Sequence, residues 1–290
     1  MKILVIGGTG FLGYHLVKYL EKQGHKVSIL DKKKGHFKKE NNKIILGDIN
    51  NIRKLSKIIK NQDIVYNFAA ISDIGESIKN PIGTAKNNIL GNLLVLDLCV
   101  KNKVKKFIFA STIYVHSNQG SFYRVSKQAS ELFITEYKKR YGLDYSIIRF
   151  GSVFGPKGSK KNGLSKIINK ALKEKKVYYS GTKNAVRRFI YVKDAVRLTA
   201  EIIKKKYNGK NILITGNSQI KITKVLKEVA KITKINKKPI FGNLKNEGHY
   251  DISPYNYTPI KDTKIKIKNT ITLKKAILEL IEEIKHEKRN

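Results

Sequence analysis

Short apolar runs alternate with longer amphipathic segments through the first half of the chain. Runs of strand length lie at Lys2–Ile6, Val27–Leu30, Lys43–Leu46, Ile64–Phe68, Lys106–Ala110 and Tyr145–Arg149. Segments with helical spacing separate them, near Phe11–Gln23, Asn51–Lys60, Thr84–Lys101 and Tyr123–Tyr141. Strands that alternate with helices in this way pair in parallel through helical crossovers. The pattern predicts an α/β fold, a doubly wound parallel sheet with helices on both faces.

A glycine triplet lies between the first predicted strand and the first predicted helix. Gly7, Gly10 and Gly13 allow a tight turn and a close approach of pyrophosphate to the helix N-terminus, as in a Rossmann-type dinucleotide site. Asp31 ends the second strand, where a carboxylate can accept bonds from ribose hydroxyls. That carboxylate would repel a 2′-phosphate, which favours NAD over NADP. Lys32 and Lys33 follow at once and could offset this repulsion in part.

The pattern becomes less regular after Gly155-Pro156. Short helices are predicted at Leu164–Lys173, Val192–Lys204, Thr223–Ile232 and Thr272–His286, and short strands at Val177–Tyr179, Phe189–Tyr191 and Ile212–Thr215. We therefore expect an NAD-binding domain over residues 1–152 and a smaller C-terminal α/β substrate-binding region over residues 153–290. Residues 211–216 are candidates to return to the main sheet.

Composition narrows the possible partners. The net charge is +38, but 52 Lys and only 8 Arg are spread along the whole chain, which indicates drift toward A/T-rich codons more than a nucleic-acid or membrane surface. Cys99 is the single cysteine, so an internal disulfide framework is excluded. No run reaches the roughly 18 apolar residues of a membrane span, and the start has no signal-peptide layout. We expect a cytoplasmic protein without metal, membrane or nucleic-acid partners.

A tyrosine and a lysine four residues apart share one helix face. The ammonium group lowers the tyrosine pKa, and the tyrosine can then accept a hydroxyl proton during hydride transfer. Such pairs begin at Tyr14, Tyr123, Tyr179 and Tyr257. Position selects Tyr123 and Lys127, because their helix follows a strand that delivers Ser111 and Thr112 to the carboxyl edge of the sheet.

These motifs together resemble the extended short-chain dehydrogenase/reductases that act on nucleotide sugars. The shared runs are Gly7-Gly8-Thr9-Gly10-Phe11-Leu12-Gly13, Ser111-Thr112-Ile113-Tyr114-Val115, Tyr123-Arg124-Val125-Ser126-Lys127 and Arg149-Phe150-Gly151-Ser152-Val153-Phe154-Gly155-Pro156. The stretch from Gly75 to Leu94 is similar to the UDP-glucose 4-epimerase branch. The resemblance covers roughly residues 1–200 and implies a homodimer that pairs the predicted helices Thr84–Lys101 and Tyr123–Tyr141.

The resemblance also implies site residues. Thr112 would bond the sugar oxygen beside Tyr123, and Lys127 would hold the nicotinamide ribose. Catalysis is thereby assigned to Tyr123, Lys127 and Thr112, and substrate binding to Thr112, Tyr123, Ser152 and Arg187. The full set of expected cofactor contacts is Gly7, Gly10, Phe11, Leu12, Gly13, Asp31, Asp48, Ile49, Ala69, Asn88 and Lys127.

Three functions remain open on these residues. The leading one is an NAD-dependent epimerase acting at C4 of a nucleotide-diphosphate sugar through a 4-keto intermediate. The alternative is an NAD(P)H-dependent reductase of a 4-keto sugar nucleotide, which the short segment between Thr112 and Tyr123 would suit. A dinucleotide-sensing regulator is the remote third. Dehydration is disfavoured, because Ile113 and Tyr114 stand where dehydratases carry an Asp-Glu pair.

Overall fold

The computed structural model describes residues 1–35, 37, 43–158, 163–242, 263–264 and 270–286, and they form two compact units. The first unit contains Met1–Phe150, Val196–Ile214 and the short strand β14 (Thr263–Lys264). The second contains Gly151–Ala195 with residues 215–242 and 270–286. The predicted boundary after residue 152 thus lies close to the first division between the units. The assignment of everything beyond it to one region differs from the structure, because residues 196–214 pack with the first unit.

A parallel sheet organises the first unit. Its strands are β1 (Lys2–Ile6), β2 (Lys26–Asp31), β3 (Lys43–Leu46), β4 (Ile64–Asn67), β5 (Lys106–Thr112), β6 (Tyr145–Phe150), β11 (Lys210–Ile214) and β14. Their order is β14-β11-β6-β5-β4-β1-β2-β3, and every pairing is parallel. The run β3-β2-β1-β4-β5-β6 is the Rossmann order, so the predicted fold class is confirmed. Of the segment 211–216 predicted as a candidate to return to the sheet, residues 211–214 lie in β11, which pairs with β6, whereas residues 215 and 216 belong to the second unit.

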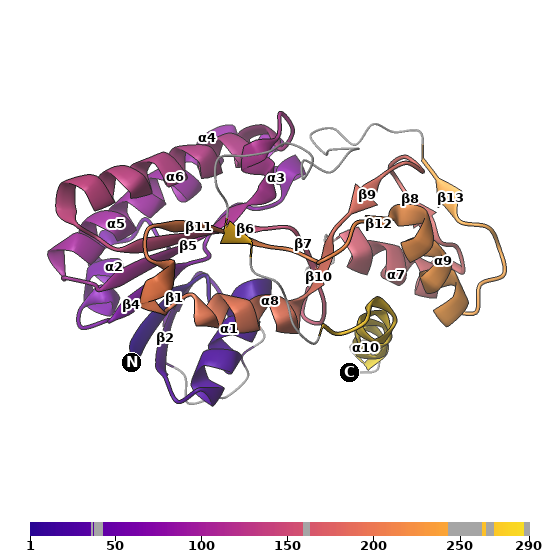
Figure 1. The fold of residues 1–290 in the computed structure, drawn as a ribbon, viewed down its shortest axis with the longest axis horizontal. Coiled ribbons are helices and arrows are strands. Elements are labelled where there is room, and N and C mark those ends of the chain that lie inside the picture. Colours follow the sequence, from indigo (N-terminus) through magenta and orange to yellow (C-terminus); the bar gives the residue numbers. More distant parts are fainter. Residues whose placement is uncertain (36, 38–42, 159–162, 243–262, 265–269, 287–290) are drawn as a thin grey trace. The chain divides into compact units, whose positions relative to one another are not determined.

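Helices cover both faces of this sheet (Figure 1). Helices α2 (Ile52–Ile59), α5 (Gly91–Lys101) and α6 (Ser121–Tyr141) lie on one face, and α1 (Phe11–Lys22) lies on the other. The C-terminal half of α8 (Val192–Glu201) also belongs to this unit, where the Thr199 carbonyl accepts a bond from the hydroxyl of the buried Tyr66 at 3.1 Å. Leucine, isoleucine, valine and phenylalanine side chains fill the core between α2, α5, α6 and the sheet.

The prediction of a continuous α-helix over Thr84–Lys101 is wrong for the middle of this segment. The structure has α4 (Pro81–Ala85), then a π-helical segment η1 (Lys86–Leu90), then α5. Apolar spacing could not reveal this, because a π segment adds a residue to a turn without changing which residue types are apolar. The wider turn buries two neighbouring amides, Asn87 and Asn88.

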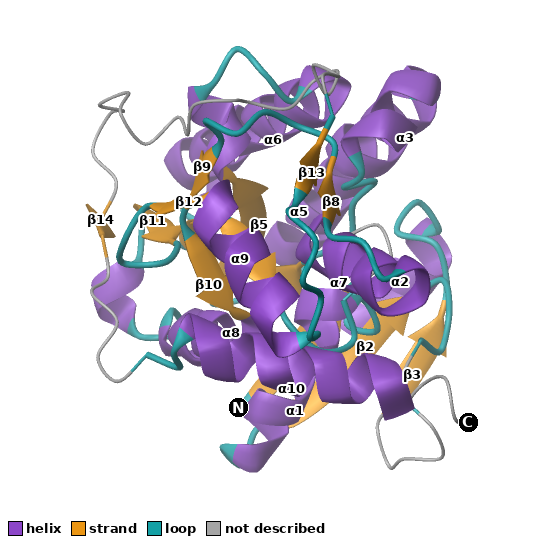
Figure 2. Ribbon diagram, turned by 90° about the vertical axis from the view of Figure 1, so that its right-hand side faces the viewer, coloured by secondary structure: helices purple, strands orange, loops and turns teal. Residues whose placement is uncertain are grey.

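The second unit is built from short elements. Strand β7 (Ser152–Phe154) pairs with β10 (Phe189–Tyr191), β9 (Val186–Arg187) with β12 (Ile220–Lys221), and β8 (Tyr178–Tyr179) with β13 (Ile240–Phe241). Helices α7 (Gly163–Glu174), α9 (Ile222–Ile232) and α10 (Leu273–His286) pack on one another (Figure 2). Among the described residues, no helix is long and apolar enough to cross a membrane.

Candidate active site

The glycine turn is closed by contacts that leave no room for side chains. Gly7 has a φ of +78°, and a Cβ there would lie 2.6 Å from the backbone nitrogen of Ala69. A Cβ at Gly13 would lie 2.2 Å from the carbonyl oxygen of Gly7. Helix α1 begins after Gly10, which offers no side-chain cap. The N–H groups of Phe11, Leu12 and Gly13 therefore head a helix whose first turn carries no acidic residue, an arrangement suited to a pyrophosphate.

Asp31 lies at the carboxyl end of β2, beside the glycine turn. Its carboxylate accepts a bond from the Thr9 backbone N–H at 3.0 Å and one from the Lys32 N–H at 2.7 Å. The Thr9 hydroxyl donates to the Lys33 carbonyl at 3.0 Å, which ties the segment after β2 to the turn. Because the carboxylate is only half-buried, it keeps room for ribose hydroxyls. The glycine turn and this acid together fit a dinucleotide.

Lys32 follows β2 and forms an ion pair with an acid that follows β3, the neighbouring strand. Its Nζ lies 3.0 Å from Oδ2 of Asp48, beyond the end of β3, and 3.5 Å from Oδ1 of Asn87 in η1. The other oxygen of Asp48 accepts from the backbone and side-chain nitrogens of Asn50, at 2.8 and 2.9 Å. Burial opposes ionisation of Asp48, but these bonds and Lys32 outweigh it and leave its pKa below the usual value. The next residue, Ile49, packs against Gly91 at the start of α5.

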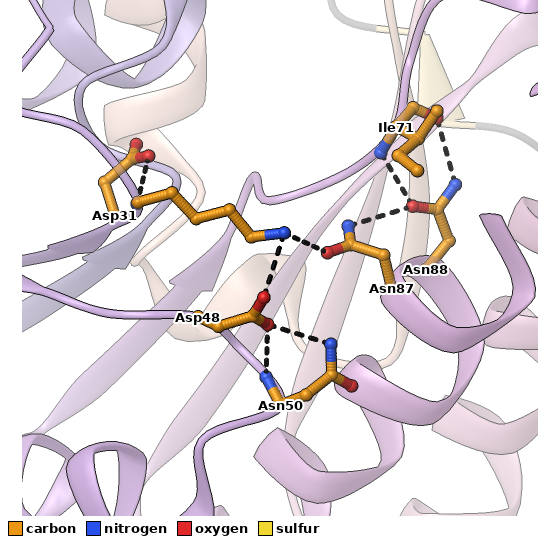
Figure 3. A network of polar contacts seen from close by, with 7 residues as sticks. Asp31, Asp48, Asn50, Ile71, Asn87 and Asn88 are labelled. Carbon is orange, nitrogen blue, oxygen red and sulfur yellow. Dashed lines mark hydrogen bonds and ion pairs between the residues drawn. The ribbon is translucent and has the colours of Figure 1, made fainter. Parts of the chain in front are cut away.

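Asn88 links this edge to helix α6. Its amide bonds both backbone groups of Ile71, at 2.8 Å to the N–H and 3.0 Å to the carbonyl (Figure 3). The same amide also donates to the Ser126 hydroxyl at 2.9 Å. Ser126 in turn donates to the carbonyl of Tyr123 at 2.8 Å. A chain of polar contacts thus runs from Lys32 through Asn87 and Asn88 to the helix that carries Tyr123.

Thr112 and Tyr123 come together across a short connection. Thr112 ends β5 and accepts from the Tyr114 N–H at 3.3 Å, which begins the 3-10 turn η2 (Ile113–His116). Gly120 and Ser121 then take left-handed φ values of +105° and +49°, so the chain reverses into α6 within few residues. A hydrogen bond joins the side chains of Tyr123 and Thr112, and it lowers the Tyr123 pKa, although burial is the larger effect and raises it to about 12.

Lys127 is almost fully buried, with 2% of its surface exposed. Its Nζ donates to the Ala110 carbonyl at 2.7 Å and lies 5.9 Å from the centre of the Tyr123 ring. Burial lowers the pKa of Lys127 to about 7, and the Glu131 carboxylate acts in the opposite direction. A proton can therefore leave or join this pair near neutral pH, which suits acid–base chemistry at Tyr123.

The remaining predicted residues belong to the second unit. Ser152 begins β7 and Arg187 ends β9. The guanidinium of Arg187 donates to the Val186 carbonyl at 2.9 Å and to the Tyr179 hydroxyl at 3.3 Å. The tyrosine–lysine pair that begins at Tyr257 lies outside the described residues. In the described residues no cluster of His, Cys, Asp and Glu could hold a metal ion.

Comparison with known proteins places this geometry in a family. The model of the NAD dependent epimerase/dehydratase family matches residues 3–215. The chain belongs to this family. Membership identifies the protein as an enzyme with NAD as its cofactor, as the glycine turn and Asp31 predicted, and confirms the resemblance to extended short-chain dehydrogenases/reductases.

Individual relatives support the same placement. A dTDP-D-glucose 4,6-dehydratase of Dictyostelium discoideum is 31% identical over 80% of this chain, which spans 62% of that protein. A putative UDP-glucose 4-epimerase of Methanocaldococcus jannaschii is 31% identical over 67% of this chain and 71% of that protein. The crystal structure of a UDP-glucuronic acid 4-epimerase from Bacillus cereus, with UDP-glucuronic acid and NAD, is similar with a TM-score of 0.84 and 25% identity over 99% of this chain and 100% of the other.

Several polar residues of the site were not predicted from the sequence. Asn87 accepts from Lys32, Ser126 accepts from Asn88, and Glu131 accepts from Ser111. Arg149 forms an ion pair with Glu131. Only Glu131 carried a usable signal, since it follows Lys127 by four positions and shares its helix face. The others depend on contacts between elements far apart in the chain.

Proposed function

We propose that this enzyme is an epimerase acting at C4 of a nucleotide-diphosphate sugar. The observation that carries the proposal is the Thr112–Tyr123–Lys127 group at the carboxyl end of β5, in the same unit as the dinucleotide turn. The similar Bacillus cereus and Methanocaldococcus jannaschii proteins bear 4-epimerase names, which supports inversion at C4. We also propose an NAD site made of the glycine turn (Gly7, Gly10, Phe11, Leu12 and Gly13) together with Asp31, Asp48, Ile49, Ala69, Asn88 and Lys127.

The chain's own groups would divide the chemistry as follows. Tyr123, as phenolate, takes the proton of the C4 hydroxyl, while Thr112 holds that oxygen in line with it. Lys127, as ammonium, stabilises the phenolate. NAD, when bound, would supply the redox chemistry: it would accept the hydride from C4 and give it back, so that no net reductant would be consumed. Tyr123 gives its proton back after the 4-keto sugar has presented its other face.

The residues after Thr112 argue against dehydration. Ile113 and Tyr114 occupy η2, and neither carries the carboxyl group that the Asp-Glu pair of a dehydratase would supply to the neighbouring sugar carbons. Similarity to a 4,6-dehydratase therefore supports the shared oxidation at C4 more than elimination. The second candidate, a 4-ketoreductase, is favoured by the tight connection through Gly120 and Ser121 between Thr112 and Tyr123.

We further propose that Ser152 and Arg187 bind substrate and that the protein is a homodimer. Apolar side chains of α6 are exposed on one side of the helix: Phe122 (46%), Val125 (47%), Leu132 (69%) and Phe133 (40%). Exposed apolar residues gathered on one helix are typical of an interface. A second copy of the chain would cover them through an isologous contact of α5 and α6.

The test offers UDP-hexoses to the purified enzyme without added NAD(P)H and follows inversion at C4 by NMR. Inversion without reductant supports the epimerase. Turnover that requires a 4-keto substrate and stoichiometric NAD(P)H would instead establish the reductase.

A further inference from the structure

A buried ion pair lies one helical turn beyond Lys127. Oε2 of Glu131 lies 2.6 Å from Nη2 of Arg149, and the side chains of the two residues are only 11% and 9% exposed. Nε of Arg149 donates to the other carboxylate oxygen at 3.1 Å, so the contact is bidentate. Taking two charges out of water is costly, and such pairs are often no more stabilising than apolar side chains. A contribution to folding stability is therefore a weak explanation for the buried Glu131–Arg149 pair.

The pair is joined to the segment that carries Thr112. The Ser111 hydroxyl donates to Oε1 of Glu131 at 2.5 Å, while Lys127 donates to the carbonyl of Ala110 at 2.7 Å. Two successive turns of α6 thus hold two successive residues of β5, directly before Thr112. The guanidinium of Arg149 also contacts Nε2 of His116 at 3.1 Å, at the end of η2.

We propose that Glu131, held by Arg149 and Ser111, is a positioning residue that keeps Lys127 charged beside Tyr123 and fixes the end of β5 at Thr112. This inference rests on the proposed function of the Thr112–Tyr123–Lys127 group. Glu131 touches neither substrate nor cofactor in this role. It acts through Lys127, because residues four apart are neighbours on one helix face.

The charge of Glu131 supports the same role as its hydrogen bonds. Glu131 raises the pKa of Lys127 against the lowering effect of burial, so the carboxylate favours the ammonium form that Tyr123 needs. The titratable and charged groups around the pair come from three elements. They are Tyr123, Lys127 and Glu131 on α6, Tyr145 and Arg149 on β6, and His116 on η2. Glu131 lies one helical turn from Lys127 and is the acidic residue nearest to it along α6.

The test follows ionisation of Tyr123 directly in the NAD-loaded protein. Ultraviolet difference titration of each protein against its Tyr123→Phe counterpart isolates this phenol from the other tyrosines. Glu131→Gln keeps the shape of the side chain but removes its charge. We expect the apparent pKa of Tyr123 to rise by about one unit, which leaves roughly tenfold less phenolate at a given pH. In turnover, kcat should fall by a similar factor with KM and NAD affinity unchanged.

Two further variants separate positioning from folding. Glu131→Gln combined with Arg149→Met removes the unpaired charge and should recover thermal stability, whereas the Tyr123 shift should persist. Glu136→Gln is the matched control, because Glu136 forms an exposed pair with Lys139 on the same helix, and it should change nothing. If the Tyr123 shift disappears when stability is recovered, or if Glu131→Gln leaves the titration of Tyr123 unchanged, the proposal is overturned. The titration needs no sugar turnover, so a wrong substrate assignment would leave its result intact.

Discussion

The ammonium group of Lys32 lies 3.0 Å from a carboxylate oxygen of Asp48 and spans the ends of two neighbouring strands. Lys32 directly follows Asp31, the acid expected to receive the ribose hydroxyls. A lysine in that place could neutralise a 2′-phosphate, but here it is directed to Asp48 and Asn87. The pair is half-exposed and therefore weak, so its effect on cofactor choice should be modest.

The preference for NAD⁺ over NADP⁺ should depend strongly on Asp31 and more weakly on Asp48. Asp31→Ala removes the repulsion of a 2′-phosphate and should narrow the preference for NAD⁺ over NADP⁺ by about tenfold, equivalent to about 1.4 kcal/mol. Asp48→Asn frees Lys32 and should narrow it by roughly twofold to fivefold, within the range of an exposed ion pair. Calorimetric titration of both dinucleotides measures the change. Asp63→Asn, which breaks the exposed pair with Lys105, is the control. Tighter binding of NADP⁺ than NAD⁺ by the wild type would contradict the assignment of Asp31.

Replacement of Tyr123 by Phe should abolish the base and keep the cofactor. We expect a rate loss on the order of 100- to 10,000-fold, with NAD affinity nearly unchanged. Thr112→Val should act more mildly, because it removes only the bond that orients the substrate oxygen. Tyr14→Phe is the control, since Tyr14 belongs to another tyrosine–lysine pair, in α1. Full activity of Tyr123→Phe would refute its catalytic assignment.

The pH profile should report the Tyr123–Lys127 pair. In the free protein the Tyr123 pKa is raised to about 12 and the Lys127 pKa is lowered to about 7. Activity needs the Tyr123 phenolate together with the Lys127 ammonium, so the rate should rise with pH up to the Lys127 pKa of about 7 and then level off. Lys127→Ala removes the stabilising ammonium, and the rising limb should move to higher pH as kcat falls. Steady-state kinetics across the pH range, together with NAD affinity as a control, test this. If the rising part of the pH–rate profile lies at the same pH in Lys127→Ala as in the wild type, Lys127 does not influence the ionisation of Tyr123.

Lys106 should make folding stability depend on pH. It is 3% exposed, and its Nζ donates to the carbonyls of Ile202 and Lys204 at 2.6 and 3.3 Å. Burial lowers its pKa from 10.5 to about 8. Between these values the unfolded chain binds more protons than the folded one, so this group makes stability rise with pH there.

Chemical denaturation of the wild type and of Lys106→Met at several pH values measures this contribution. The stability of the wild type relative to Lys106→Met should grow as pH increases from about 8 to 10.5, the two pKa values. The exposed neighbour Lys105, as Lys105→Met, should show no such trend. A difference between wild type and Lys106→Met that stays constant with pH would show that burial does not shift the lysine.

The proposed dimer depends on the exposed apolar side of α6. Leu132 is 69% exposed, and Leu132→Glu places a charge where a second copy would pack, so it should give monomers at micromolar concentration. Leu278→Glu, on α10 of the second unit, is the control and should leave the mass unchanged. Light scattering measures both. A monomeric wild type would refute the dimer.

Local patterns were sufficient to predict the elements of the first unit. Apolar runs and helical spacing located β1, β3 and α1 to within a residue. The reason is that the spacing of apolar residues within a segment reflects which of its side chains are buried. The glycine triplet with Asp31, and Tyr123 with Lys127, could also be selected from the sequence. Each combines residues close in the chain with a known position at the end of a strand.

Other features were decided only by the tertiary structure. The π-helical turn that buries Asn87 and Asn88 is one of them. The Lys32–Asp48 contact and the Glu131–Arg149 pair are others, and each joins residues of different elements whose proximity depends on how the sheet and its helices are arranged. A lysine-rich sequence offers many equivalent charges, and nothing in the local pattern says which one reaches an acid on a neighbouring strand. Packing of the sheet brings Lys32 to 3.0 Å from Asp48, and only then do burial and Coulomb interaction distinguish one lysine from another.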